Sequence, residues 1–220
     1  MLAFILRRLA QAALVMLAVA FVAFMLFQYV GDPVVQFLGQ DATPEQVAAV
    51  RAELGLDQPF FVQFWQFVVH AVQGNFGMSI HQGVPVARLI AERFPATLEL
   101  ALVAAGLALL VGIPMGVYAA LRRGSFLAQV FMTISLLGVS LPTFLIGIVL
   151  ILVFAVHLGW FPSFGRGEVT HLGGWTTGLL TAKGWHHLVL PAVTLAIFQL
   201  TLIMRLVRAE MLEVLRTDYI

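Results

Sequence analysis

Long stretches without a charged residue decide what this chain can fold into. The first runs for 22 residues, from 9 to 30, and a helix needs about 20 apolar residues to cross the hydrocarbon core of a bilayer. Comparable apolar stretches occupy residues 97–121, where Glu99 is the one charged residue, part of 126–160, and 188–204. The composition agrees, because 61% of the residues are hydrophobic and 10% are charged, against roughly 45–50% and 25% in a soluble domain. The sequence therefore predicts an all-α, polytopic transmembrane helix bundle with four spans.

The first span has a competing interpretation as a cleaved signal peptide, because Arg7 and Arg8 precede it. The apolar stretch is longer than the 7–15 residues of a typical signal core, and no small-x-small cleavage site closes it cleanly. We therefore predict a helix that is retained in the membrane.

Residues 31–96 form the one substantial polar segment. Thr43 is placed to cap a helix, with Pro44 at its first position and Gln46 completing a capping box. Gly55 is expected to end that helix. A further short helix is expected to open at Pro85 and to end near residues 94–95.

A second helix in the same segment is expected to start at residues 57–59 and to break at Gly74 and Gly77. Its residues are too apolar for a helix surrounded by water: Phe60, Phe61, Phe64, Trp65, Phe67 and Val68. We expect it to lie on the membrane surface or to pack on the transmembrane helices.

Glu99 is the only acidic residue of the second span. A carboxylate near the start of a span can sit at the interface and interact favourably with a helix N-terminus, so a structural role is favoured over a functional one. Further along, Gly112, Pro114 and Gly116 are expected to make the helix bendable and to let a neighbouring helix approach closely.

The uncharged stretch 126–160 is too long for one crossing, which suggests an interfacial lead-in followed by the third span. Ser140, Pro142 and Thr143 lie where the two would meet, and Pro142 is expected to kink or interrupt the helix. Residues 157–187 are expected to form a loop. These three residues and Gln199, which lies in the middle of the fourth span, are the candidate pathway or hinge residues.

Other polar residues of the spans have a simpler interpretation, which is hydrogen bonding between helices. They are Gln11, Gln28, Thr133, Ser135, Thr194 and Thr201.

Catalytic chemistry finds little support. The sequence has no phosphate-binding G-x-x-x-x-G-K-[ST] loop, no G-x-G-x-x-G fingerprint and no H-E-x-x-H motif. The chain has no cysteine, and its six histidines include no i,i+4 pair. Serines and histidines alone do not supply the buried base and orienting partner of a triad. We expect no catalytic residue, cofactor or metal, and with a net charge of +1 no nucleic-acid partner.

The arginines give the predicted orientation. If four spans alternate, one side receives Arg7, Arg8, Arg122, Arg123, Arg205, Arg208 and Arg216. The short loop opposite carries only Arg166 and Lys183. The positive-inside rule then makes the arginine-rich side, including the N-terminus, cytoplasmic.

The last 16 residues, 205–220, continue the fourth span as an amphipathic helix. Met204, Val207, Met211 and Leu215 can share one face. The other faces carry the charged residues expected to meet the cytosol. From the pattern alone, a solvated helix end and a site gripped by a soluble partner are about equally supported.

Eight motifs resemble one family in order along the whole chain. They are the arginine pair at 7–8, GDP at 31–33, RAELGLDQP at 51–59, GNFGMS at 74–79, PATLELAL at 95–102, SLPTF at 140–144, LVLPAVTL at 188–195 and MLEVLRTDYI at 211–220. They are similar to the inner-membrane permease subunits of the dipeptide, oligopeptide and nickel class of ABC importers.

The resemblance implies partners and a mechanism. The chain would pair with a second, homologous permease in the bacterial inner membrane, receive solute from an external solute-binding protein, and be driven by two cytosolic ATPase subunits. ATPase closure would push a cytoplasmic coupling helix and switch the pathway. The residues expected at its start are Arg208, Glu210, Glu213, Arg216, Asp218 and Tyr219.

The chain is accordingly divided into four parts. Residues 1–30 form the cytoplasmic N-terminus and first span, 31–96 an external segment with short and interfacial helices, 97–204 spans two to four, and 205–220 the start of the coupling helix. The family's glycine-containing cytoplasmic loop and last two spans would follow position 220, so a C-terminal truncation is expected. Short peptides, including glutathione-like tripeptides, are the favoured cargo. Nickel or another small solute, and a non-transport membrane anchor or assembly protein, remain alternatives.

Overall fold

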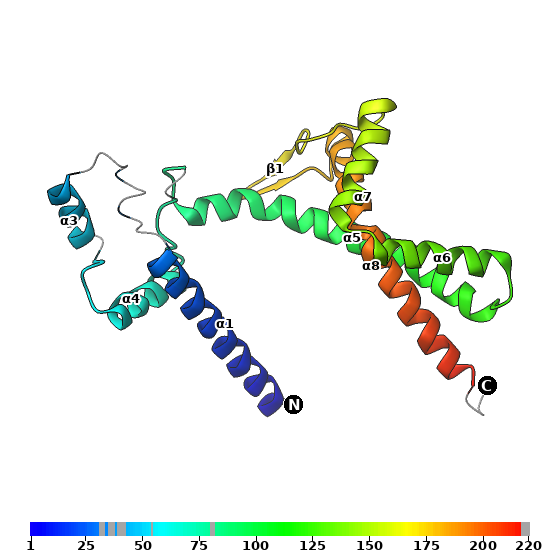
Figure 1. Cartoon of the computed structure of the whole chain (residues 1–220), viewed down its shortest axis with the longest axis horizontal. Coiled ribbons are helices and arrows are strands. Elements are labelled where there is room, and N and C mark those ends of the chain that lie inside the picture. The colour runs from blue at the N-terminus through cyan, green and yellow to red at the C-terminus, as the bar shows by residue number, and fades with distance from the viewer. Residues whose placement is uncertain (31–33, 35–37, 39–42, 54, 80–81, 217–220) are drawn as a thin grey trace. The chain divides into compact units, whose positions relative to one another are not determined.

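The computed structural model describes residues 1–30, 34, 38, 43–53, 55–79 and 82–216. The chain separates into two compact units, Met1–Ala91 and Glu92–Ile220, and Figure 1 shows the helices of each. Three helices of the described residues are long and apolar enough to cross a membrane. A fourth crossing results if a bent pair of helices counts as one span. The predicted helical membrane fold is confirmed.

The first unit begins with α1 (Leu2–Val30), followed by α3 (Pro44–Glu53) and α4 (Phe60–Val72). The predicted capping box at the start of α3 is present. The Thr43 N–H donates to Oε1 of Gln46 at 3.0 Å, and the Gln46 N–H donates to Oγ1 of Thr43 at 3.3 Å. Gly55 follows α3 with a φ of 66°, a left-handed conformation that glycine adopts at little cost.

Aromatic side chains join α4 to the C-terminal part of α1. The Phe21 ring centroid lies 5.6 Å from that of Phe60 and 5.1 Å from that of Phe64. The Phe24 ring lies 5.6 Å from that of Phe67. The expectation that α4 packs on a transmembrane helix is therefore confirmed for this face of α4.

The second unit contains most of α5 (Val86–Leu121), then α6 (Phe126–Ser140), α7 (Thr143–Leu150) and the π-helix η1 (Ile151–His157). A loop with an antiparallel hairpin follows, in which β1 (Thr170–Leu172) pairs with β2 (Trp175–Thr177) and Thr170 lies opposite Thr177. The last helix is α8 (Ala182–Val214). Residues 182–187, which were expected to belong to the loop 157–187, instead form the first turn and a half of α8.

The predicted helix end near residues 94–95 is wrong, because α5 continues through Pro95 as well as Pro114. A proline inside a helix removes one backbone hydrogen bond. Membrane helices tolerate this loss where neighbouring side chains supply other bonds and packing continues. Here Pro95 itself is buried, so packing continues around it.

The predicted interruption at Pro142 is confirmed. Leu141 and Pro142 both have extended backbone angles, with ψ values of 132° and 136°. The helix α6 and the pair α7–η1 are bent by 106° at this break. The proline lacks the N–H that a continuous helix would require, and it disfavours helical geometry at Leu141.

Small residues make the contacts between α8 and its neighbours. Ala104 and Ala108 of α5 and Ala196 of α8 are buried together in the core. An added Cβ at Gly116 of α5 would lie 2.7 Å from the Met204 carbonyl oxygen of α8. An added Cβ at Gly112 would lie 3.1 Å from the Leu200 carbonyl oxygen. The predicted close approach at these two glycines is confirmed.

The polar residues of the spans act differently from the expected hydrogen bonding between helices. Five hydroxyls donate to a carbonyl three or four residues earlier in their own helix: Thr133, Ser135, Ser140, Thr194 and Thr201. A hydroxyl satisfied in this way does not need a partner helix. The methyl groups of Thr194 and Thr201 instead face Gly147 of α7 and Gly138 of α6.

Candidate functional site

Helix α8 brings the candidate sites together, because it contacts α5, α6 and α7 and continues without a break into the charged C-terminal residues. The apolar part of α8, which is long enough to cross a membrane, and its amphipathic C-terminal part therefore form one continuous helix. With a rise of about 1.5 Å per residue, its 33 residues extend for about 50 Å.

The C-terminal end of α8 carries the predicted coupling residues. Glu210 and Glu213 are exposed on the helix, and Arg216 is exposed in the turn after it. Arg208 is half-buried, and its Nε is buried without a hydrogen-bond partner among the described residues. The sites predicted at Asp218 and Tyr219 lie outside the described residues.

The apolar face of this helix end matches the sequence pattern. Met204 is fully buried, whereas Val207, Met211 and Leu215 are half-buried. The exposed charges and the more buried apolar residues thus occupy different faces, as the amphipathic spacing predicted.

The predicted pathway or hinge residues are only partly brought together. Ser140, Pro142 and Thr143 meet at the bend between α6 and α7. Gln199 is half-buried on α8, and its two-residue separation from Thr201 places it on roughly the opposite side of the helix. Since Thr201 is the α8 residue that faces Gly138 of α6, the bend and Gln199 form no common cluster.

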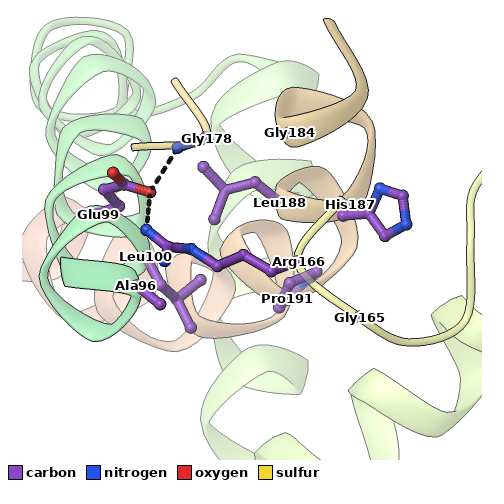
Figure 2. A pocket seen from close by; sticks show the side chains of 10 residues that line it. All are labelled: Ala96, Glu99, Leu100, Gly165, Arg166, Gly178, Gly184, His187, Leu188 and Pro191. Atoms are coloured by element: carbon purple, nitrogen blue, oxygen red, sulfur yellow. Dashed lines mark hydrogen bonds and ion pairs between the residues drawn. The ribbon is translucent and has the colours of Figure 1, made fainter. Parts of the chain in front are cut away.

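An ion pair between a buried and a half-buried side chain lies near the N-terminal end of α8, where Figure 2 shows Glu99 and Arg166 joined by a dashed line. The Glu99 carboxylate accepts hydrogen bonds from Nη2 of Arg166 and from the Gly178 N–H, both at 3.2 Å. Arg166 also donates through Nη1 to Oγ1 of Thr176 and through Nη2 to its carbonyl, each at 2.7 Å. One carboxylate of α5 thereby holds the loop and its hairpin.

The expectation that Glu99 favours a helix N-terminus is wrong, because α5 begins 13 residues earlier, at Val86. Glu99 is 5% exposed, and a buried carboxylate requires charge and hydrogen-bond partners. Arg166 was not predicted as that partner. The available signal was physical: a single acid in a span needs a cation, and the loop 157–181 contains one arginine.

The same loop is fixed to α8 at several points. Thr181 caps the helix, since its Oγ1 accepts from the Gly184 N–H at 3.0 Å, and it donates to the Glu168 carbonyl at 2.6 Å. Gly178 and Gly184 approach so closely that no side chain fits between them. The loop therefore cross-links α5 to α8.

Two neighbouring cavities border this cross-link, of about 180 and 440 Å³. They share Leu100, Gly165, His187 and Pro191 as lining residues. Glu99 and Arg166 line the smaller cavity, as Figure 2 shows. The larger is bounded mainly by residues of α8 and by residues 162–165 of the loop before it. Within the described residues, no group of three or more histidine or acidic side chains could hold a metal ion.

Comparisons with known proteins match both parts of the chain to one transport family. Residues 1–101 match the N-terminal membrane component of binding-protein-dependent transport systems. Residues 112–220 match the binding-protein-dependent transport system inner membrane component.

Curated relatives extend this match over the full chain. A putative peptide transport system permease of Brucella suis is 44% identical over all of this chain and 68% of its own length. A probable peptide ABC transporter permease of Sinorhizobium fredii is 39% identical over 98% of this chain and 67% of its own. A glutathione transport system permease of Salmonella choleraesuis is 36% identical over all of this chain and 67% of its own.

The matches to transport permeases thus extend over the whole of this chain. The chain belongs to the family of binding-protein-dependent transport system inner membrane components, the permease subunits of ABC transporters.

Proposed function

We propose that this permease subunit imports short peptides, including glutathione-like tripeptides, that an external solute-binding protein delivers. The proposal is supported by the relatives, which are named as peptide and glutathione transport permeases. A second permease subunit would complete the translocation pathway, and two cytosolic ATPase subunits would supply the energy.

The distribution of basic residues supports an orientation with the N-terminus in the cytoplasm of a bacterial cell. Arg7 and Arg8 lie in the first third of α1, Arg122 follows the end of α5, and Arg205 and Arg208 lie toward the C-terminal end of α8. Alternating spans would bring these arginines to the same side, which the positive-inside rule makes cytoplasmic. The ion pair between Glu99 and Arg166 would then lie near the external side.

The coupling mechanism is supported mainly by one observation: α8 is a single unbroken helix from its contacts with other helices to its charged C-terminal end. A force on its exposed C-terminal charges would act on a helix whose glycine and threonine contacts also hold α5, α6 and α7. Because packed interfaces have discrete arrangements, a small displacement at one end could select a different arrangement of the bundle. We propose Arg208, Glu210, Glu213, Arg216, Asp218 and Tyr219 as the start of the surface that meets the ATPase.

The bend at Pro142 is proposed as the hinge that accommodates this motion. Leu141 and Pro142 interrupt the helical hydrogen bonds, so the angle between α6 and α7 can change without breaking a regular helix. Ser140 and Thr143 flank this hinge, and Gln199 stays a separate candidate for the pathway.

The coupling proposal is tested in the full-length protein with its ATPase, partner permease and binding protein. The double charge reversal Glu213→Arg and Arg216→Glu is expected to weaken co-purification of the ATPase and to lower ATP-dependent peptide uptake into proteoliposomes. Glu45→Arg provides a matched control, because Glu45 is exposed in α3 of the first unit. Unchanged ATPase association and uptake in the double variant would contradict the coupling role.

The cargo is tested separately by measuring uptake of a labelled dipeptide, glutathione and Ni²⁺ in the wild-type transporter. Peptide uptake that nickel does not inhibit supports the proposal, whereas uptake of nickel alone would favour the alternative importer. A deletion strain with normal peptide uptake and a missing membrane complex would instead favour an anchor or assembly protein.

A further inference from the structure

Helix α4 presents three chemically different faces. The first packs on α1 through Phe60, Phe64 and Phe67, whose rings lie 5.1–5.7 Å from those of Phe21 and Phe24. Several edge-on and tilted ring contacts of this kind stabilise the pairing beyond the area that they bury. They also fix how α4 is rotated about its own axis.

The second face is polar and binds the turn before the helix. Gln63 is 7% exposed, and its Nε2 donates to the carbonyls of Leu56 at 3.1 Å and Gln58 at 2.7 Å. Gln66 Nε2 donates to Oε1 of Gln58 at 3.1 Å. These bonds hold the polar residues toward the preceding turn, so α4 has little freedom to turn its apolar residues inward.

The third face is apolar and exposed. Phe61, Trp65 and Val72 are 75%, 66% and 84% exposed, and about 100° of rotation per residue places them within roughly 40° of one another. No residue between Phe60 and Val72 carries a formal charge. Leaving such a face in water would be unfavourable by about 25 cal/mol for each Å² of apolar surface.

The contact with α1 sets the depth of this face. Arg7 and Arg8 interrupt the apolar part of α1 at one end, and a core of about 30 Å corresponds to about 20 helical residues. Counted from Leu9, that core ends near residue 28. Phe21 and Phe24 then lie about 6–10 Å inside the opposite boundary, which is the depth that the apolar side of an interfacial helix reaches.

From these observations we infer that α4 is a lipid-binding anchor, with Phe61, Trp65 and Val72 inserted among the acyl chains of the leaflet where α1 ends. This depth excludes a water-soluble binding protein, which does not reach below the headgroups, and a membrane subunit that covered the face would appear as low accessibility to both probes in the test below. An indole at this level also suits the boundary between acyl chains and headgroups. That this leaflet is the external one rests on the proposed orientation, whereas contact with lipid does not.

The absence of cysteine from the chain allows a direct test by site-directed spin labelling. Phe61→Cys, Trp65→Cys and Val72→Cys would each be labelled with a nitroxide in the full-length transporter in liposomes. Gln66→Cys and His70→Cys are matched controls, because both residues are exposed on the same helix but on its polar side. Collision of the nitroxide with apolar oxygen and with a water-soluble nickel chelate is then measured by power saturation.

We expect oxygen to relax the label several-fold more than the nickel chelate at positions 61, 65 and 72, and the reverse order at 66 and 70. High nickel accessibility at 61, 65 and 72 would overturn the proposal in favour of a water-facing surface, as would low accessibility to both reagents, which indicates cover by protein. Only variants that retain wild-type peptide uptake are compared. Three positions on one face keep the test valid if a single variant does not fold.

Discussion

The Glu99 carboxylate and the Arg166 guanidinium lie 3.2 Å apart between Oε2 and Nη2, although 67 residues separate them in the sequence. The Glu99 side chain is 7% exposed and that of Arg166 is 30% exposed. Gly178 and Thr176 bind the same pair. The two charges therefore hold the loop between η1 and α8 at several points and do not form one isolated contact.

Glu99→Gln is expected to lower the stability of the purified transporter by about 1–3 kcal/mol, because Arg166 would remain half-buried without its counter-charge. Thermal unfolding in detergent measures the effect. Glu168→Gln is the control, since Glu168 pairs with Lys183 at 3.4 Å but both side chains are more than 60% exposed. That change should cost about 0–1 kcal/mol. Equal effects of the two substitutions would show that the buried pair has no special role.

Gly138→Ala tests the contact between α6 and α8. An added Cβ would lie 2.6 Å from Cγ2 of Thr201, a β-branched and fully buried side chain that has little freedom to move. We expect a loss of about 1–3 kcal/mol in unfolding free energy. Gly106→Ala is the control within a helix, because no heavy atom of the described structure comes within 4 Å of its added Cβ. Its melting temperature should stay the same or rise, since alanine favours helix.

Thr201 separates the roles of a hydroxyl and a methyl group. Its hydroxyl donates to the Phe198 carbonyl of its own helix at 2.7 Å, while its methyl faces Gly138. Thr201→Val keeps the methyl and should change stability by less than about 1 kcal/mol, because that carbonyl also belongs to the helical backbone ladder. Thr201→Ser removes the methyl and should cost about 1 kcal/mol. The opposite order in thermal unfolding would assign the contact to the hydroxyl.

Gly184→Ala is expected to detach the loop from the start of α8. The added Cβ would overlap the carbonyl of Gly178. Because the N–H of Gly178 binds Glu99, the loop must move away from Glu99, and this movement exposes Arg166. Limited proteolysis with trypsin should then cut the variant faster than the wild type after Arg166. Gly174→Ala should leave the cleavage rate unchanged, because its added Cβ has open space among the described residues. Identical cleavage of both variants would rule out the proposed cross-link.

Much of this fold could be predicted because its signals are local. The presence of helices long enough to cross a membrane follows from the apolar runs, the bend follows from the missing N–H of Pro142, and the start of α3 follows from the spacing of Thr43 and Gln46. The prediction at Pro95 failed because the outcome there depends on residues that are far apart in the sequence. Whether a helix continues through a proline depends on the packing that surrounds it, and the local sequence does not describe that packing.

The candidate site also has one part that the local sequence predicted and one part that it did not. The amphipathic spacing after Met204 correctly predicted that Glu213 and Arg216 are exposed, but Arg208, expected on the same side, is half-buried. The coupling role of these residues stays a prediction. The sequence by itself determined that this chain is a helical membrane permease, because hydrophobic length and ordered motifs are properties of the chain alone. Only the tertiary structure decided that Glu99 binds Arg166 and that Gly138 receives the Thr201 methyl. Such pairs depend on how each helix is rotated and packed against the others, and residues this far apart in sequence carry no local signal of it.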